Sequence, residues 1–123
     1  MTIQELYLKI DGSYDQAVRV MKSDRLIDKY VRKLKDSNVG DALAQAGETM
    51  DAVKLFESAH AMKGVCANLG LDALAAAAGE ITEEFRPGKE RRLSDEEVKV
   101  RLDAIAERYR RTVEAIRRYE AEA

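Results

Sequence analysis

The chain contains a single histidine, His60, which is the first candidate for chemistry. Apolar residues recur around it at steps of three and four, which predicts a helix that is buried along one side. These apolar residues are Leu55, Ala59, Met62, Cys66 and Leu69. At about 100° per residue, His60 lies about 140° from Leu55 and therefore outside the apolar face. We expect its imidazole to point into solvent.

An exposed histidine usually has no function, but three features of its surroundings favour one here. Gly64 follows one turn later, where glycine costs about 1 kcal/mol relative to alanine, and its bare backbone would let a large group approach the ring. Lys63 is close enough on the helix for its ammonium to reach an anion carried by the imidazole. Val53, Phe56 and Ala67 fall on the same outer side, and this apolar patch indicates a docking surface.

Simpler interpretations exist for several of these residues. Phe56 is equally well explained as a residue at the edge of the core, because it lies about 100° from the apolar face. Lys63 could be an ordinary solvated lysine, and Cys66 is expected in the core. One histidine without clustered carboxylates makes a poor metal site, and no serine or cysteine is spaced to use it as a base.

The composition predicts one helical domain over residues 1–123. Hydrophobic residues make up 46% of the chain, and a single proline occurs among abundant helix-forming residues. The 21 basic and 23 acidic residues give a net charge of −2, which argues against nucleic acid and membrane surfaces as partners. One cysteine excludes an internal disulfide. Because neither a membrane-spanning run nor a signal-peptide core is visible, we expect a cytoplasmic protein.

Two short helices are predicted near the N-terminus, over residues 2–10 and 14–21. They are too short to be stable alone, so we expect residues 1–22 to form a helical cap on a larger body. Ser23 or Asp24 can cap the next helix. The predicted buried face of this helix consists of Leu26, Ile27, Tyr30, Val31 and Leu34.

This helix is expected to be interrupted or capped again at residues 36–38 and to end at Gly47. Thr49 is the predicted N-cap of the central helix, and Asp51 would lie in its first turn. Leu69 and Gly70 are expected to end the central helix, which carries His60.

An alanine-rich helix is predicted after the central one, and its small side chains favour close packing against a neighbour. The break Arg86-Pro87-Gly88 and a charged loop follow; the basic residues there could steer an acidic partner, although a solvated loop is simpler. Ser94 and Glu97 have the spacing of a capping box at the start of a long last helix. Together these segments predict an all-α fold, an antiparallel four-helix bundle over residues 23–121 with a short N-terminal helical cap.

The stretch A-H-A-M-K-G-V-C-A-N-L-G, from Ala59 to Gly70, resembles the signature A-H-x-x-K-G-x-x-x-x-L-G of histidine-containing phosphotransfer (HPt) domains. The segments L-I-D-K-Y-V-R-K-L and D-A-V-K-L-F-E-S-A-H also resemble stand-alone members of that family. The resemblance implies that His60 accepts a phosphoryl group from a receiver-domain aspartate and passes it to another receiver. It also implies that Lys63 stabilises the phosphoryl charge and that Gly64 provides steric clearance.

The resemblance therefore implies a phosphoprotein of two-component signal transduction, a carrier in a phosphorelay and not an enzyme. We expect no kinase activity, because the chain has no glycine-rich nucleotide loop. No cofactor is expected, since the partner receiver would bind the Mg²⁺. The expected partners are response-regulator receiver domains, which would contact Val53, Phe56 and Ala67, and possibly a hybrid sensor kinase. We expect a monomer.

Two other functions remain open from the sequence. An HPt-like module could dock on a receiver or kinase and regulate it without ever being phosphorylated. A structural protein could dimerise along the last helix, whose seven-residue repeat runs for nearly four heptads. The polar Thr112 within that repeat, and the need for the same apolar face in the bundle, disfavour a dimer.

Overall fold

The computed structural model describes residues 1–122, and all regular secondary structure within them is helical, which confirms the predicted all-α class. The helices follow in the order α1 (Ile3–Lys9), α2 (Tyr14–Met21), α3 (Asp24–Asp36), α4 (Val39–Thr49), α5 (Ala52–Asn68), α6 (Asp72–Glu84) and α7 (Asp95–Ala121). Across residues 1–122, none of the helices is long and apolar enough to cross a membrane.

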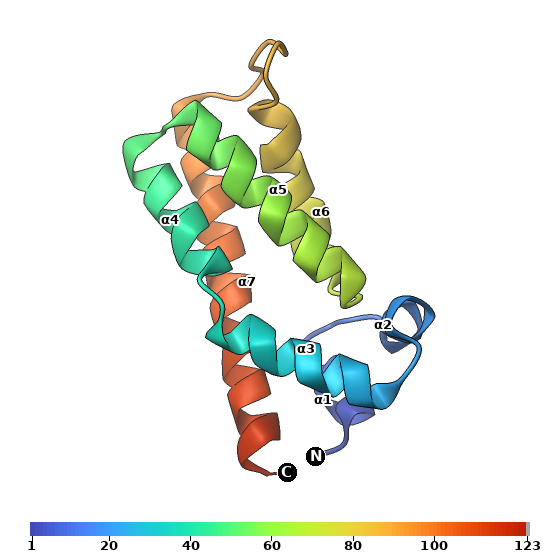
Figure 1. Cartoon of the computed structure of the whole chain (residues 1–123). Coiled ribbons are helices and arrows are strands. Elements are labelled where there is room, and N and C mark those ends of the chain that lie inside the picture. Colours follow the sequence, from blue (N-terminus) through green and yellow to red (C-terminus); the bar gives the residue numbers. More distant parts are fainter. Residues whose placement is uncertain (123) are drawn as a thin grey trace.

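Helices α4, α5, α6 and α7 run beside one another in alternating directions and form the bundle (Figure 1). α7 is longer than its neighbours and continues past the end of the bundle, where α1 and α3 pack against it. α2 lies between α3 and the C-terminal end of α5. This arrangement confirms a helical bundle with added N-terminal helices, while the boundary of the predicted cap at residue 22 stays a prediction.

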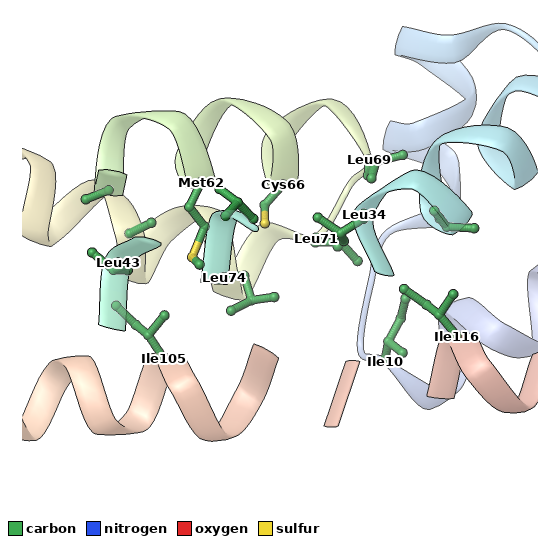
Figure 2. Packing of buried hydrophobic residues seen from close by; sticks show 14 of the residues in the cluster. Ile10, Leu34, Leu43, Met62, Cys66, Leu69, Leu71, Leu74, Ile105 and Ile116 are labelled. Atoms are coloured by element: carbon green, nitrogen blue, oxygen red, sulfur yellow. The ribbon is translucent and has the colours of Figure 1, made fainter. Parts of the chain in front are cut away.

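The core forms where the predicted apolar face of α5 meets the other bundle helices. All five residues of this face are buried, as predicted: Leu55, Ala59, Met62, Cys66 and Leu69. Figure 2 shows Met62 and Cys66 pointing from α5 toward the interior, where Leu74 of α6 and Ile105 of α7 meet them. α6 makes its most extensive contact with α5, in keeping with its many alanines.

Two predicted helix ends are wrong. α5 is capped by Asp51, whose side chain accepts a hydrogen bond from the backbone N–H of Lys54 at 3.1 Å, and Thr49 instead ends α4. α4 also continues through Gly47, where a Cβ atom would lie only 2.8 Å from Cδ1 of Leu102. This glycine therefore allows close approach of α7 and does not stop the helix.

The predicted buried face of α3 is correct for only three of its five residues. Ile27, Val31 and Leu34 are buried, whereas Leu26 and Tyr30 are each 37% exposed. α3 lies beyond the end of the bundle, where it packs mainly against α7 and α2. With fewer neighbours than a bundle helix, α3 buries a narrower apolar stripe than its sequence allows.

Residues of the N-terminal region donate hydrogen bonds to the backbone directly after α5. The hydroxyl of Tyr7 in α1 donates to the carbonyl oxygen of Leu69 at 2.6 Å, and the N–H of Ser13 donates to the carbonyl of Gly70 at 2.7 Å. Gly70 has a φ of 69°, and a Cβ there would lie 2.2 Å from the carbonyl oxygen of Ser13. Glycine is therefore required where the chain turns from α5 into α6.

The loop between α6 and α7 is held by one buried carboxylate. Glu84 is 7% exposed and accepts hydrogen bonds from the backbone N–H groups of Arg92 and Leu93 and from the guanidinium of Arg91. Burial by itself raises the pKa of Glu84. The Leu93 N–H, the Arg91 side chain and the Arg92 N–H together outweigh this effect and hold the pKa below its ordinary value.

This site predicts a specific loss of stability in acid. A carboxylate whose pKa is lowered by folding stabilises the native state above the pKa of the unfolded chain, about 4.3, and loses that contribution as pH falls further. We expect Glu84→Gln to lower the free energy of unfolding by about 1–2 kcal/mol at pH 7. Urea unfolding should show that the difference from the original chain shrinks as the pH falls below about 4.3. A difference that is constant with pH would contradict this role for Glu84.

Candidate functional site

His60 lies in the middle of α5 on the outside of the bundle and is exposed, as predicted. Its ring is nearly parallel to that of Phe56, one turn earlier, with an interplanar angle of 9° and 5.8 Å between the centroids. Phe56 is itself half-buried and packs against the core. A partly fixed aromatic ring therefore restricts the plane of the exposed imidazole.

Gly64 lies one turn after His60 on the same exposed side of α5. A Cβ atom at this position would have nothing within 4 Å, so the surface beside the imidazole is open. The packing of this chain therefore gives no reason for a glycine in the middle of an exposed helix. Its predicted role, clearance for a molecule that approaches His60, stays a prediction.

The aliphatic part of the Lys63 side chain packs against α6. Its Cδ and Cε atoms lie 3.5 Å and 3.7 Å from the position that a Cβ of Gly79 would occupy, so the side chain crosses α6 at this glycine. Its charge contributes to lowering the pKa of Glu83, although the hydrogen bond from Arg86 is the largest cause. The structure thus turns Lys63 toward α6, one turn from the imidazole.

The basic residues Arg86 and Lys89 were expected in a solvated loop, and the carboxylate that binds them, Glu83 of α6, was not predicted. The Nε of Arg86 donates to Oε2 of Glu83 at 2.7 Å, and the Nζ of Lys89 lies 3.8 Å from Oε1 of the same carboxylate. The guanidinium carbon of Arg86 lies 5.4 Å from the centre of the Phe56 ring, within cation–π range. The i,i+3 spacing of Glu83 and Arg86 was the one available signal, but it did not indicate which helix they face.

The three apolar residues predicted to bind a partner share the outer side of α5 with His60. Val53 is 63% exposed, whereas Phe56 and Ala67 are half-buried. We call the outer strip the set Val53, Phe56, His60, Lys63, Gly64 and Ala67. Phe56 packs against the core, as one of its two interpretations expected, while its role as a docking contact stays a prediction.

Cys66 lies on the opposite side of α5 and is fully buried, as predicted. Burial raises the pKa of its thiol to about 12, so the reactive thiolate is scarce at neutral pH. Within residues 1–122, no group of three or more histidine, cysteine, aspartate or glutamate side chains is arranged to hold a metal ion.

The family to which the chain belongs follows from its middle and C-terminal parts. A family model described as Hpt domain matches residues 29–119. The chain belongs to the Hpt domain family. Searches of curated proteins and of solved structures find no match. Hpt domains take part in histidine phosphotransfer within phosphorelays, and the segment that matches contains the whole outer strip.

The open space at Gly64 of this Hpt domain predicts a gain of stability on substitution. We expect Gly64→Ala to raise the free energy of unfolding by about 0.5–1 kcal/mol, because alanine has the higher helix propensity and meets no neighbour. Denaturant unfolding would measure the change. Gly70→Ala is the matched control and should destabilise the chain, because its φ is positive and the Ser13 carbonyl blocks a Cβ. A loss of stability in Gly64→Ala would show that the glycine serves the fold.

Proposed function

We propose that this Hpt domain is a phosphocarrier, in which His60 takes a phosphoryl group from a receiver-domain aspartate and gives it to another receiver. The observation that carries the proposal is the exposed imidazole on an outer helix face, directly beside a glycine that leaves the surface open. A helix without function would be more stable with alanine at this position.

The proposed step is a single displacement at phosphorus. The lone pair of the His60 Nε2 forms an N–P bond while the O–P bond of the aspartyl phosphate breaks, and the aspartate carboxylate leaves with the electron pair. The Nδ1 proton is then lost to solvent or stays on the ring. Return transfer to a second receiver reverses these changes, so the carrier needs no nucleotide.

Positioning and charge are the two contributions that such a transfer requires from the protein. The stacking of His60 on Phe56 supports a restricted imidazole plane, which favours in-line attack. Lys63 would supply positive charge to the phosphoryl oxygens by moving its flexible end away from Gly79. Gly64 would let the receiver's active site close over the ring.

The rest of the reaction is assigned to the partner. We propose that the receiver domain holds the Mg²⁺ and the acidic pocket, and that this chain has no cofactor or kinase activity of its own. Val53, Phe56 and Ala67 would make the apolar contact with the receiver around the histidine. The protein is proposed to act as a monomer in the cytoplasm.

The decisive test is transfer from a receiver. The chain incubated with ³²P-phosphorylated receiver domains should acquire acid-labile, alkali-stable label, and His60→Gln should acquire none. Lys63→Gln should slow the transfer about two- to fivefold, as expected for an exposed charge. If the original chain binds receivers but never carries label, it is a docking module and the carrier proposal is wrong. Label on His60→Gln would refute the assignment of the histidine.

The docking role of the outer strip predicts a difference between two exposed valines. Val53 on α5 is 63% exposed and Val100 on α7 is 68% exposed, so aspartate should be tolerated at both positions. Val53→Asp should reduce the rate of transfer at low receiver concentration by at least about fivefold, because it places a charge in an apolar contact. Val100→Asp should leave the rate unchanged. Equal effects of the two substitutions would place the contact elsewhere.

A further inference from the structure

The register between α5 and α6 brings Glu83 to the same level of the bundle as the part of α5 that carries His60. Lys63 lies against Gly79, and the Phe56 ring lies beneath the Arg86 guanidinium. The two helices are antiparallel neighbours. Phe56 and Lys63 are seven residues apart in the chain, and so are their partners Arg86 and Gly79. His60 lies between Phe56 and Lys63 on α5, and Glu83 of α6 lies between Gly79 and the loop residue Arg86. Glu83 therefore faces the part of α5 that carries His60.

Glu83 forms ion pairs with two basic residues of the loop after α6, Arg86 and Lys89. Arg86 holds it with a hydrogen bond of 2.7 Å from Nε and a second contact of 2.6 Å from Nη2, and Lys89 approaches it to 3.8 Å. Together with the charges of Lys89 and Lys63, the hydrogen bond from Arg86 lowers the pKa of the Glu83 carboxyl. Arg86, which lies over the Phe56 ring beside His60, is thus bound to a carboxylate on the neighbouring helix, and so is Lys89.

A phosphoryl group on His60 would compete with this carboxylate. It would bring several anionic oxygens to the side of α5 that Glu83 faces, and guanidinium and ammonium groups bind such oxygens strongly. Glu83 acts against the phosphoryl group in two ways, since it occupies the cations and also adds a negative charge nearby. Both effects have the same sign, so removal of the Glu83 charge should favour phosphorylation.

We propose that Glu83 is a positioning residue that holds the side chains of Arg86 and Lys89 while His60 is unmodified and releases them when His60 carries a phosphoryl group. This inference rests on the proposed function of His60. In this role Glu83 competes with the phosphoryl group for the cations. The competition limits the stability of the phosphorylated form, so that the phosphoryl group can still be transferred. Glu83 touches no reacting atom and acts through the two cations.

A small phosphoryl donor tests the idea without any receiver. Phosphoramidate transfers its phosphoryl group to an imidazole nitrogen, so that its N–P bond breaks, a new N–P bond forms at His60 and ammonia leaves with the electron pair. Glu83→Gln should be phosphorylated about two- to fivefold faster than the original chain, the range expected for exposed charges. The Glu83 side chain is 47% exposed, so the amide should leave the fold intact, which circular dichroism would verify.

The matched control is Glu80→Gln, which removes the same charge from the same helix. Glu80 forms an ion pair with Arg101 of α7, whereas Arg86 and Lys89 pair with Glu83, so removal of the Glu80 charge should leave the rate unchanged. An equal acceleration in Glu80→Gln, or no acceleration in Glu83→Gln, would overturn the proposal. Failure of label transfer from receivers would instead refute the carrier function, since phosphoramidate requires no receiver.

A double-mutant cycle separates the positioning role from simple charge repulsion. In a chain that already carries Arg86→Gln and Lys89→Gln, Glu83→Gln should accelerate phosphorylation much less than in the original chain. The reason is that no cations remain for the carboxylate to hold. If the acceleration is as large without the two cations as with them, Glu83 acts only through its own charge and the positioning role is wrong.

Discussion

The close antiparallel packing of α5 on α6 is the contact on which the site depends. Ala59 of α5 and Ala78 of α6 are both fully buried, and the stem of Lys63 passes over α6 where Gly79 has no side chain. Small residues at the contact let two helices approach closely, and the close approach sets their register. Bulkier residues on α6 would move its charged side chains away from His60.

The two sides of α5 are subject to different constraints: the inner side packs in the core and the outer side is exposed. Its inner side is filled by five buried apolar residues, so substitutions there act on packing and stability. The outer strip carries an exposed imidazole, a stacked phenyl ring and a glycine with free space around it. Gly64 is the clearest example of this difference between the two sides, because glycine lowers the stability of the helix and no packing contact requires it at this position. A helix with one side committed to the core can change its other side at little cost to the bundle.

The sequence predicted what depends on local periodicity. The buried face of α5 and the exposure of His60 follow from the geometry of a single helix, and both are confirmed. Gly47 was misassigned because a glycine that ends a helix and one that admits a neighbour look alike in sequence. Leu26 and Tyr30 were expected in the core because periodicity defines an apolar face and does not say how much of it finds a partner.

The charged part of the site could not be predicted from local patterns. Glu83 and Arg86 reach the neighbourhood of His60 only through the packing register of α5 and α6, which depends on contacts between residues far apart in the chain. The same register turns Lys63 toward Gly79. The basic residues after α6 looked like a solvated run, yet Arg86, Lys89 and Arg91 are all bound to glutamates of α6.

The bonds that Tyr7 and Ser13 make to the end of α5 have a consequence for how the family segment is used here. The carbonyls of Leu69 and Gly70 are satisfied by residues that precede the matched segment, which begins at residue 29. Carbonyls at the end of a helix need partners from outside that helix. Two of the hydrogen bonds at the end of α5 therefore come from α1 and from the residue that caps α2. Sequence changes in these two helices can alter the rigidity of the histidine-bearing helix from a distance, while its outer strip stays the same.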